Sequence, residues 1–156
     1  MKRRTTSRPH QEAGQVGGIE VLPLALLVFV AGALLVANAW AVVDAKMAAS
    51  AAAREAARAY AEVPSGMGQD GAWAGAVTAA RDTLVAYEMP PERVSLHPLA
   101  APDPLRCARV VVEAGITVPF ITVPWLGAFG EGFVVRARHS ELVDPFRSGL
   151  EGDGCA

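Results

Sequence analysis

The chain has 156 residues and a formal net charge of −2, so it can form one modest domain and has no overall basic field that would attract nucleic acid. Its charge is unevenly distributed, because four basic residues precede the first acidic one: Lys2, Arg3, Arg4 and Arg8. Neither of the two cysteines has a metal-binding spacing. No cofactor, nucleic acid or small-molecule substrate is therefore expected.

Residues 21–43 contain no charge, and Asn38 is their only strongly polar residue. About 23 residues in a helix extend about 35 Å, which is enough to cross the hydrocarbon core of a bilayer. A cleaved secretory signal has a shorter apolar region, and the core helix of a soluble protein rarely extends this far without a charge. We therefore expect one transmembrane helix at residues 21–43, with the lipid bilayer as its partner.

The charges that flank this segment predict its orientation in the cell membrane. The excess of basic residues lies before the segment, which favours a cytoplasmic N-terminus. Residues 1–20 are then a basic cytoplasmic leader or tail, and the residues after about position 44 lie outside the cytoplasm. Trp40 is expected at the outer interface, where indole rings are enriched.

The helix is expected to continue beyond the membrane through residues 44–62, where alanine dominates and no glycine or proline interrupts before Pro64. The whole helix would then extend from about Glu20 to Glu62. A surface of small side chains allows another backbone to approach closely. A solvated spacer helix is the alternative interpretation.

Residues 72–143 are expected to form a small extracytoplasmic domain. After the glycine- and proline-rich loop at residues 64–71, helical spacing indicates a helix over residues 72–88 that ends before Pro90. Its expected apolar stripe consists of Trp73, Val77, Ala80, Leu84 and Tyr87.

Alternating apolar residues then indicate strands, at about residues 93–97, 107–118 and 132–142. In the second strand the inward residues are expected to be Ala108, Val110, Val112, Ala114, Ile116 and Val118, and in the third Phe133, Val135 and Ala137. The prolines at 119 and 124 and the glycines of residues 125–132 predict a loop between them. The resulting fold class is α+β, with the second helix packed on a small antiparallel sheet of about three strands in meander order. Residues 144–156 are expected to be a loose tail.

The two cysteines, Cys107 and Cys155, allow two interpretations. They can form a disulfide if the domain lies in an oxidising compartment, and they are otherwise two free thiols.

The sequence does not suggest a catalytic site. His97 and His139 lack a recognisable catalytic context and are better explained as exposed residues of strands. The glycine-rich residues 127–132 precede a strand instead of opening a helix, so they do not suit phosphate binding, and a hairpin-like loop is the better interpretation. We therefore expect no enzymatic activity.

One residue before the apolar segment has the character of a functional residue. Glu20 lies at the edge of the membrane, where an unpaired carboxylate is costly, although an ordinary interfacial charge is the alternative. A basic tail, a glycine, several small residues, a glutamate and an apolar helix follow one another here. This order is that of a prepilin-type leader, in which a membrane peptidase cuts after the glycine.

The chain resembles the TadE-like family of minor pseudopilins from tight-adherence pili. Residues 14–24 (GQVGGIEVLPL) are similar to the start of the family, Gly-x-x-x-Val-Glu followed by a proline. The segment Ala52, Ala53, Arg54, Glu55, Ala56, Ala57 and Arg58 is close to a motif that the family carries after its membrane helix. Residues 110–141 are similar to its valine-rich strand, proline-bearing loop and last strand.

The resemblance implies a non-catalytic, membrane-anchored pseudopilin in pilus assembly or related secretion. Its implied partners are other pilin-like subunits, platform proteins of the pilus or secretion system, and a prepilin peptidase. Processing would follow Gly14 and leave Gln15 as the first residue, although Glu20 is then the sixth residue where the family usually has it fifth. The residues of the 52–58 segment would pack against neighbouring helices. A membrane-tethered binding or sensor domain unrelated to pili is the alternative function, and a tethered hydrolase is a second one.

Overall fold

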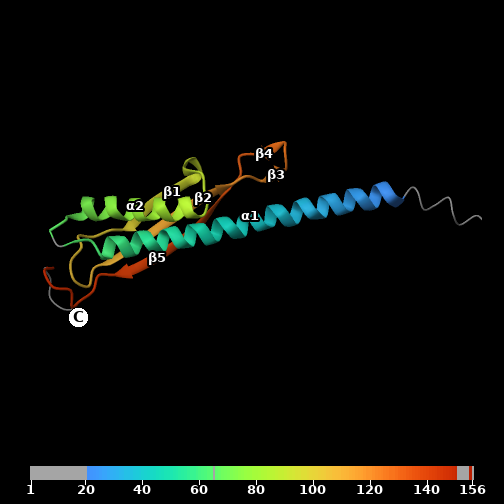
Figure 1. The fold of residues 1–156 in the computed structure, drawn as a ribbon. Helices are drawn as coiled ribbons and strands as arrows, with labels where there is room; N and C mark the ends of the chain where they lie inside the picture. The colour runs from blue at the N-terminus through green and yellow to red at the C-terminus, as the bar shows by residue number, and fades with distance from the viewer. Residues whose placement is uncertain (1–20, 65, 151–154, 156) are drawn as a thin grey trace, which may run out of the picture. The chain divides into compact units, whose positions relative to one another are not determined.

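The computed structural model describes residues 21–64, 66–150 and 155. Its elements are α1 (Val21–Ala61), α2 (Gln69–Ala86), a 3-10 turn (Pro91–Arg93), β1 (Val94–Ala100), β2 (Arg109–Val118), β3 (Ile121–Val123), β4 (Gly127–Phe129) and β5 (Phe133–Leu142) (Figure 1). The predicted α+β class, with a long apolar helix, a second helix and a three-stranded antiparallel sheet, is confirmed. The chain consists of two compact units, Met1–Val36 and Ala37–Ala156.

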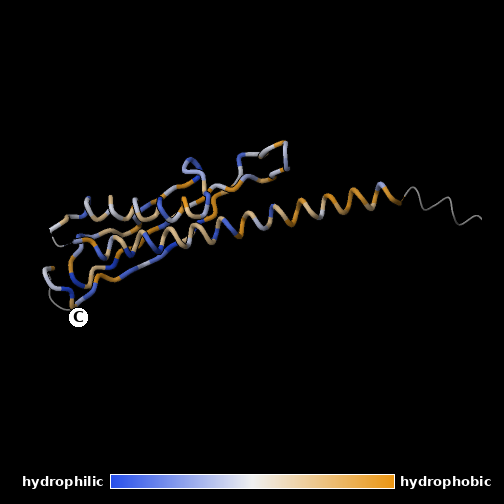
Figure 2. Tube along the Cα trace, in the orientation of Figure 1, coloured by the Kyte–Doolittle hydropathy of each residue, from blue (hydrophilic) through white to orange (hydrophobic). Residues whose placement is uncertain are grey.

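Helix α1 is continuous over 41 residues and contains both predicted parts of the long helix. Pro23 lies in its first turn, where a missing backbone N–H costs little. The helix ends at Ala61, three residues before Pro64. Figure 2 shows an almost uninterrupted hydrophobic colour along its first half. The long helix thus ends within one residue of the predicted end.

Helix α2 is shifted toward the N-terminus relative to its prediction at residues 72–88. It starts at Gln69 because Gly68 adopts an extended conformation before the helix, and Asp70 lies favourably in the first turn. It ends at Ala86 in a Schellman motif, in which Met89 N–H donates to the Leu84 carbonyl oxygen at 3.0 Å. Glu88 has a φ of 54° in this motif, so the helix cannot continue to it.

The sheet has the order β1-β2-β5, and both neighbouring pairs are antiparallel. The central strand buries the predicted face through Val110, Val112, Ala114, Ile116 and Val118, whereas Ala108, also expected inside, precedes β2 and is only partly buried. On β5 only Ala137 is fully buried, and Phe133, which was expected inside, is exposed. β1 continues to Ala100, three residues beyond its predicted end, with an irregular register after Pro98.

A second, two-stranded ribbon lies between β2 and β5, where the sequence predicted a loop. β3 and β4 pair antiparallel, with Thr122 opposite Ala128. Leu126 N–H donates to the Val123 carbonyl oxygen at 3.2 Å and closes the turn between them. The expected loop is therefore a hairpin, and the two short strands were missed because Pro124 fits the second position of a tight turn, so it ends β3 without preventing strand pairing.

The core contains residues from both helices and the buried face of the sheet. The sequence predicted that only the second helix would cover this face. In the structure the alanine-rich half of α1 also contributes, and it does so through Ala45, Ala48, Ala49, Ala52, Ala53, Ala56 and Ala57. At its end the Tyr60 hydroxyl donates to the Pro102 carbonyl oxygen at 2.7 Å. The small side chains of α1 therefore allow α2 and the sheet of the same chain to pack closely against this helix.

The second helix buries part of the predicted stripe, since Ala80 and Leu84 lie in the core as expected. Its fully buried residues are Ala72, Ala76, Ala80 and Leu84, whereas Trp73 and Val77 are only partly buried. Tyr87, expected in the core, is exposed because the Schellman motif ends the helix before it.

Candidate functional site

The first half of α1 is a candidate membrane-spanning helix. Its most apolar 18-residue window has a mean hydropathy of 2.5, and none of that window is buried inside the protein. Leu27, Val28 and Phe29 are typical of the stretch, since each exposes more than half of its surface. Such side chains need an apolar environment that the described part of the chain does not supply. Within the described residues, the structure thus supports one membrane anchor.

The predicted processing and assembly residues, Gly14, Gln15 and Glu20, lie outside the described residues. The described chain begins one residue after Glu20, with Val21 in α1.

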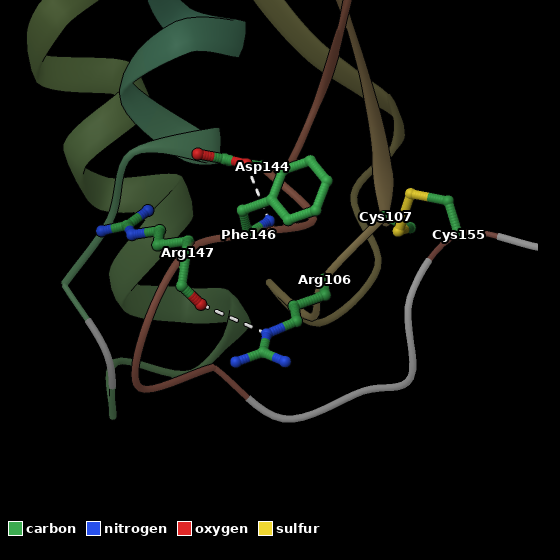
Figure 3. Close-up of a disulfide and its surroundings, with 6 residues drawn as sticks. All are labelled: Arg106, Cys107, Asp144, Phe146, Arg147 and Cys155. Atoms are coloured by element: carbon green, nitrogen blue, oxygen red, sulfur yellow. Dashed lines mark hydrogen bonds between the residues drawn. A yellow bond between two sulfur atoms is a disulfide. The ribbon is translucent and has the colours of Figure 1, made fainter.

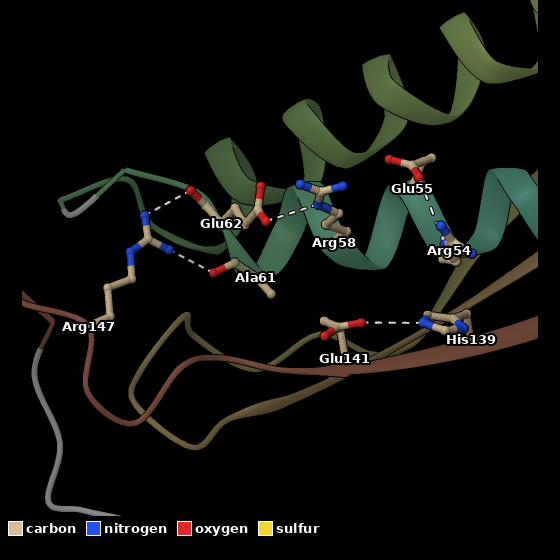
Figure 4. Close-up of polar contacts among 8 residues, drawn as sticks. All are labelled: Arg54, Glu55, Arg58, Ala61, Glu62, His139, Glu141 and Arg147. Carbon is tan, nitrogen blue, oxygen red and sulfur yellow. Dashed lines mark hydrogen bonds and ion pairs between the residues drawn. The ribbon is translucent and has the colours of Figure 1, made fainter.

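The segment from Ala52 to Arg58 has a buried side and a charged side. Its four alanines, Ala52, Ala53, Ala56 and Ala57, expose at most 1% of their surface. Its charged residues point outward, with Arg54 Nε 4.0 Å from an oxygen of Glu55. Arg58 Nε lies 2.9 Å from Glu62 Oε1 across one helical turn, and this hydrogen bond raises the pKa of Arg58 (Figure 4). Arg54, Glu55 and Arg58 are thus the part of the segment that another molecule can reach.

A clasp formed by Arg147 holds the end of α1. Its guanidinium donates to the carbonyl oxygens of Ala61, Glu62 and Val63 at 2.7, 2.8 and 2.6 Å. A helix leaves its last carbonyls without partners inside the helix, and Ala61 is the last residue of α1, with Glu62 and Val63 directly after it. Arg106 Nε in turn donates to the Arg147 carbonyl oxygen at 3.2 Å (Figure 3). The expectation of a loose tail from position 144 is therefore wrong for its first residues.

The structure joins Cys107 and Cys155 in a disulfide, with their Cα atoms 5.3 Å apart (Figure 3). Cys107 precedes β2, and its N–H donates to the Val143 carbonyl oxygen at 3.1 Å. The bond fixes a residue near the end of the chain to the start of the central strand.

The two histidines of the domain lie on opposite faces of the sheet. His97 is opposite Glu113 in the β1-β2 register, whereas His139 is opposite Val112 in the β2-β5 register. Successive residues of a strand point to opposite faces, so the two rings do not converge. His139 Nε2 is instead 3.3 Å from Glu141 on its own strand.

Glu113 is the one charged residue that the described chain buries. Its carboxylate accepts a hydrogen bond from Arg138 Nε at 2.6 Å and lies 3.5 Å from Arg136 Nε. The hydrogen bond from Arg138 lowers the pKa of Glu113, and the nearby positive charges act in the same direction. Among the described residues, no group of three or more His, Cys, Asp or Glu is placed to hold a metal ion.

A pocket of about 470 Å³ lies between α2 and β1. Its lining is apolar apart from Arg81 and consists of Trp73, Val77, Arg81, Leu84, Val85, Met89, Pro91, Val94 and Leu96. A single cation in an apolar lining does not provide the nucleophile and base that hydrolysis needs.

Asn38 has a structural role that sequence reasoning missed. Its side-chain nitrogen donates to the Thr122 carbonyl oxygen at 3.3 Å, and its side-chain oxygen accepts from Thr122 N–H at 2.6 Å. This one amide therefore pairs with both backbone groups of a residue in β3. The signal was the presence of an asparagine in an otherwise apolar segment, but its partner, 84 positions later, cannot be read from the sequence.

Comparisons of the chain with protein-family models, with curated proteins and with solved structures gave no match.

Proposed function

We propose that this protein is a membrane-anchored, TadE-like pseudopilin, which acts in pilus assembly or related secretion as a non-catalytic subunit. It would sit in the cell membrane with a cytoplasmic N-terminus and an extracytoplasmic domain. Its partners would be pilin-like subunits and platform proteins, and a prepilin peptidase would process its leader after Gly14.

One observation supports this proposal above the others. Helix α1 is both the exposed apolar anchor and, without a break, a core element of an α+β domain that has an antiparallel sheet. In a protein with a separable anchor, a linker would be expected between the membrane segment and the domain. A helix that is shared between the anchor and the domain suits a subunit that assembles through its helix.

The role of Glu20 follows from the same arrangement. The carboxylate precedes a helix whose next charged residue is Asp44. In an assembly of such helices, Glu20 would pair with the free amine of a neighbouring processed subunit. Breaking a buried ion pair by removing one partner typically costs about 3–5 kcal/mol.

The test is recovery of pilin-like partners with the tagged protein after extraction of the membranes in mild detergent. Glu20→Ala should lose these partners while membrane level and domain folding stay normal. Glu12→Ala, which removes a carboxylate from the same basic segment, is the matched control and should recover them. Mass spectrometry of the mature N-terminus should show Gln15 as the first residue.

Normal partner recovery by Glu20→Ala would contradict the pseudopilin proposal. A membrane-tethered binding domain would then be the better description, and the pocket between α2 and β1 would be the place to look for its ligand. Fusion of alkaline phosphatase to the C-terminus tests orientation independently, since an active fusion requires an extracytoplasmic domain.

A further inference from the structure

The β3-β4 ribbon exposes an unusual concentration of large apolar side chains. They are Phe120, Ile121, Trp125, Leu126 and Phe129, and each exposes more than half of its surface. Trp125, at the tip of the turn, is completely exposed. Single exposed apolar residues are common on protein surfaces, but a continuous patch marks an interaction site.

The ribbon also lacks charge. Residues 119–130 contain no acidic or basic side chain, and the first charge after them is Glu131, before β5 with Arg136 and Arg138. Exposed hairpins in water usually carry charges that oppose aggregation. A ribbon that combines exposed aromatic residues with a complete absence of charge suits a lipid surface better than water.

The turn presents its tryptophan through a backbone conformation that bulky residues rarely adopt. Trp125 has a φ of 67°, at a position where glycine or asparagine would be usual. Pro124 precedes it, as is common in this kind of turn. Strained backbone conformations of this kind cluster at functional sites, and here the conformation presents a fully exposed tryptophan.

Asn38 fixes the ribbon at a defined level of α1. Its two hydrogen bonds to Thr122 place β3 beside the helix six residues before Asp44, the first charged residue after the apolar segment. Six residues correspond to about 9 Å along a helix axis. Amphipathic elements that lie in a membrane interface bury their apolar face by about 5–10 Å, so the level matches the interfacial layer.

The two hydrogen bonds between Asn38 and Thr122 also lower the free-energy cost of placing β3 in lipid. A strand edge that enters an apolar environment must have its backbone groups paired. Thr122 directs its N–H and carbonyl toward Asn38, away from β4, and the amide side chain satisfies both. Trp40, which is exposed on α1 near the same level, adds a second indole of the kind that is enriched at interfaces.

We propose that residues 119–130 form an interfacial membrane hairpin, which inserts Trp125 and its apolar neighbours into the leaflet on the domain side, beside α1. This inference rests on α1 crossing the membrane. The hairpin is a second contact with the bilayer, and it fixes the rotation of the domain against the membrane surface in a way that one helix cannot.

Depth-dependent fluorescence quenching tests the proposal, because the chain has only three tryptophans, Trp40, Trp73 and Trp125. The full chain is reconstituted in phosphatidylcholine–phosphatidylglycerol vesicles that contain lipids brominated at defined acyl positions. Three variants each retain one tryptophan and have phenylalanine at the other two positions. Trp125 alone should be quenched most by shallow bromines and should be protected from acrylamide. Trp40 alone reports insertion of α1, and Trp73 alone, in α2, should show no lipid quenching.

The outcomes separate this proposal from the anchor on which it rests. Quenching of Trp40 without quenching of Trp125 would overturn the hairpin and leave the anchor intact. Failure of both would reject the anchor. Protection of Trp125 from acrylamide without bromine quenching would show a protein contact, such as a second copy of the chain, and would also overturn the proposal.

A charge in the hairpin provides a second test. In the variant that retains Trp125 alone, Leu126→Glu should abolish most of the bromine quenching. Thermal unfolding of the domain should be unchanged, because Leu126 is exposed. Val85→Glu, at an exposed position of α2, is the matched control and should retain full quenching. Retained quenching in Leu126→Glu would contradict the proposal.

Discussion

The two halves of α1 are both apolar and helical, yet they differ in the size and burial of their side chains. Residues 21–43 carry leucine, valine and phenylalanine, most of them exposed. Residues 44–61 carry mainly alanine, of which seven positions are buried in the domain core. Large exposed apolar groups require lipid, whereas small groups allow other elements of the chain to approach closely. The size of the side chains therefore distinguishes the half of α1 that suits lipid from the half that packs in the domain core. Hydrophobicity alone does not distinguish them.

A charge in the first half should have the largest effect. Val30→Arg places a cation near the middle of the apolar segment, which costs about 2.5–3.5 kcal/mol on an insertion scale. The fraction of protein that floats with membranes should fall, and the unfolding temperature of the domain in detergent should not change. Val85→Arg, the same change at an exposed valine of α2, should affect neither measurement. A domain destabilised by Val30→Arg would show that the first half belongs to the soluble core.

A larger side chain in the second half of α1 should lower the stability of the domain and leave membrane insertion unchanged. Ala53 is completely buried, so Ala53→Leu should overpack the core and cost about 1–3 kcal/mol. Each kcal/mol lowers the unfolding temperature of a domain of this size by about 4–8 °C. Membrane flotation should be normal. Ala74→Leu, at an exposed position of α2, should leave the unfolding temperature nearly unchanged, and an equal loss in both variants would disprove close packing at Ala53.

A substitution at Tyr60 tests the contribution of a single hydrogen bond at the end of α1. Tyr60→Phe removes the hydrogen bond to the Pro102 carbonyl and should cost about 0.5–1.5 kcal/mol in urea unfolding at neutral pH. Burial raises the pKa of Tyr60 above its ordinary value of 10.0. The neutral phenol is thus favoured in the folded state, so its stability contribution is complete below pH 10 and decreases as pH rises through the higher, folded pKa. Tyr60→Phe should flatten this alkaline decrease, and an unchanged alkaline limb would contradict the assignment.

The smallest effect is expected on the charged side of the second half. Arg58 and Glu62 form an exposed pair, and such pairs contribute little to stability in water. Arg58→Ala should leave the urea midpoint of the isolated protein unchanged within error. A measurable decrease in the urea midpoint would show that Arg58 contributes to stability beyond its pair with Glu62. It would also weaken the distinction between the buried alanines and the exposed charges of this segment.

The parts that could be predicted are those governed by local pattern. The extent of α1 follows from composition and the proline after it, and the buried face of β2 follows from strict alternation. The shift of α2 shows the limit of this reasoning. Its boundaries depend on the conformation of Gly68 and on a Schellman motif at Glu88, which are local but have weak sequence signals.

The parts that could not be predicted depend on contacts between distant residues. The sequence showed that the alanines would admit a close neighbour, but not that the neighbours were α2 and the sheet. The prolines and glycines of residues 119–130 predicted a loop, and Asn38 alone gave no indication that it would hold a strand there. The Arg147 clasp was missed for the same reason, because its acceptors are backbone carbonyls more than eighty positions earlier.

That clasp has a consequence for local opening. Most helices are capped by residues adjacent in sequence, so their ends fray independently of the rest of the fold. Here the last turn of α1 is capped by Arg147, which Arg106 holds in place. Separation of the segment around Arg147 and fraying of the helix end are therefore one event in a unit that is discontinuous in sequence. The hydrogen-exchange rates of the amides near Ala61 and of those near Arg147 should therefore change together when solution conditions change.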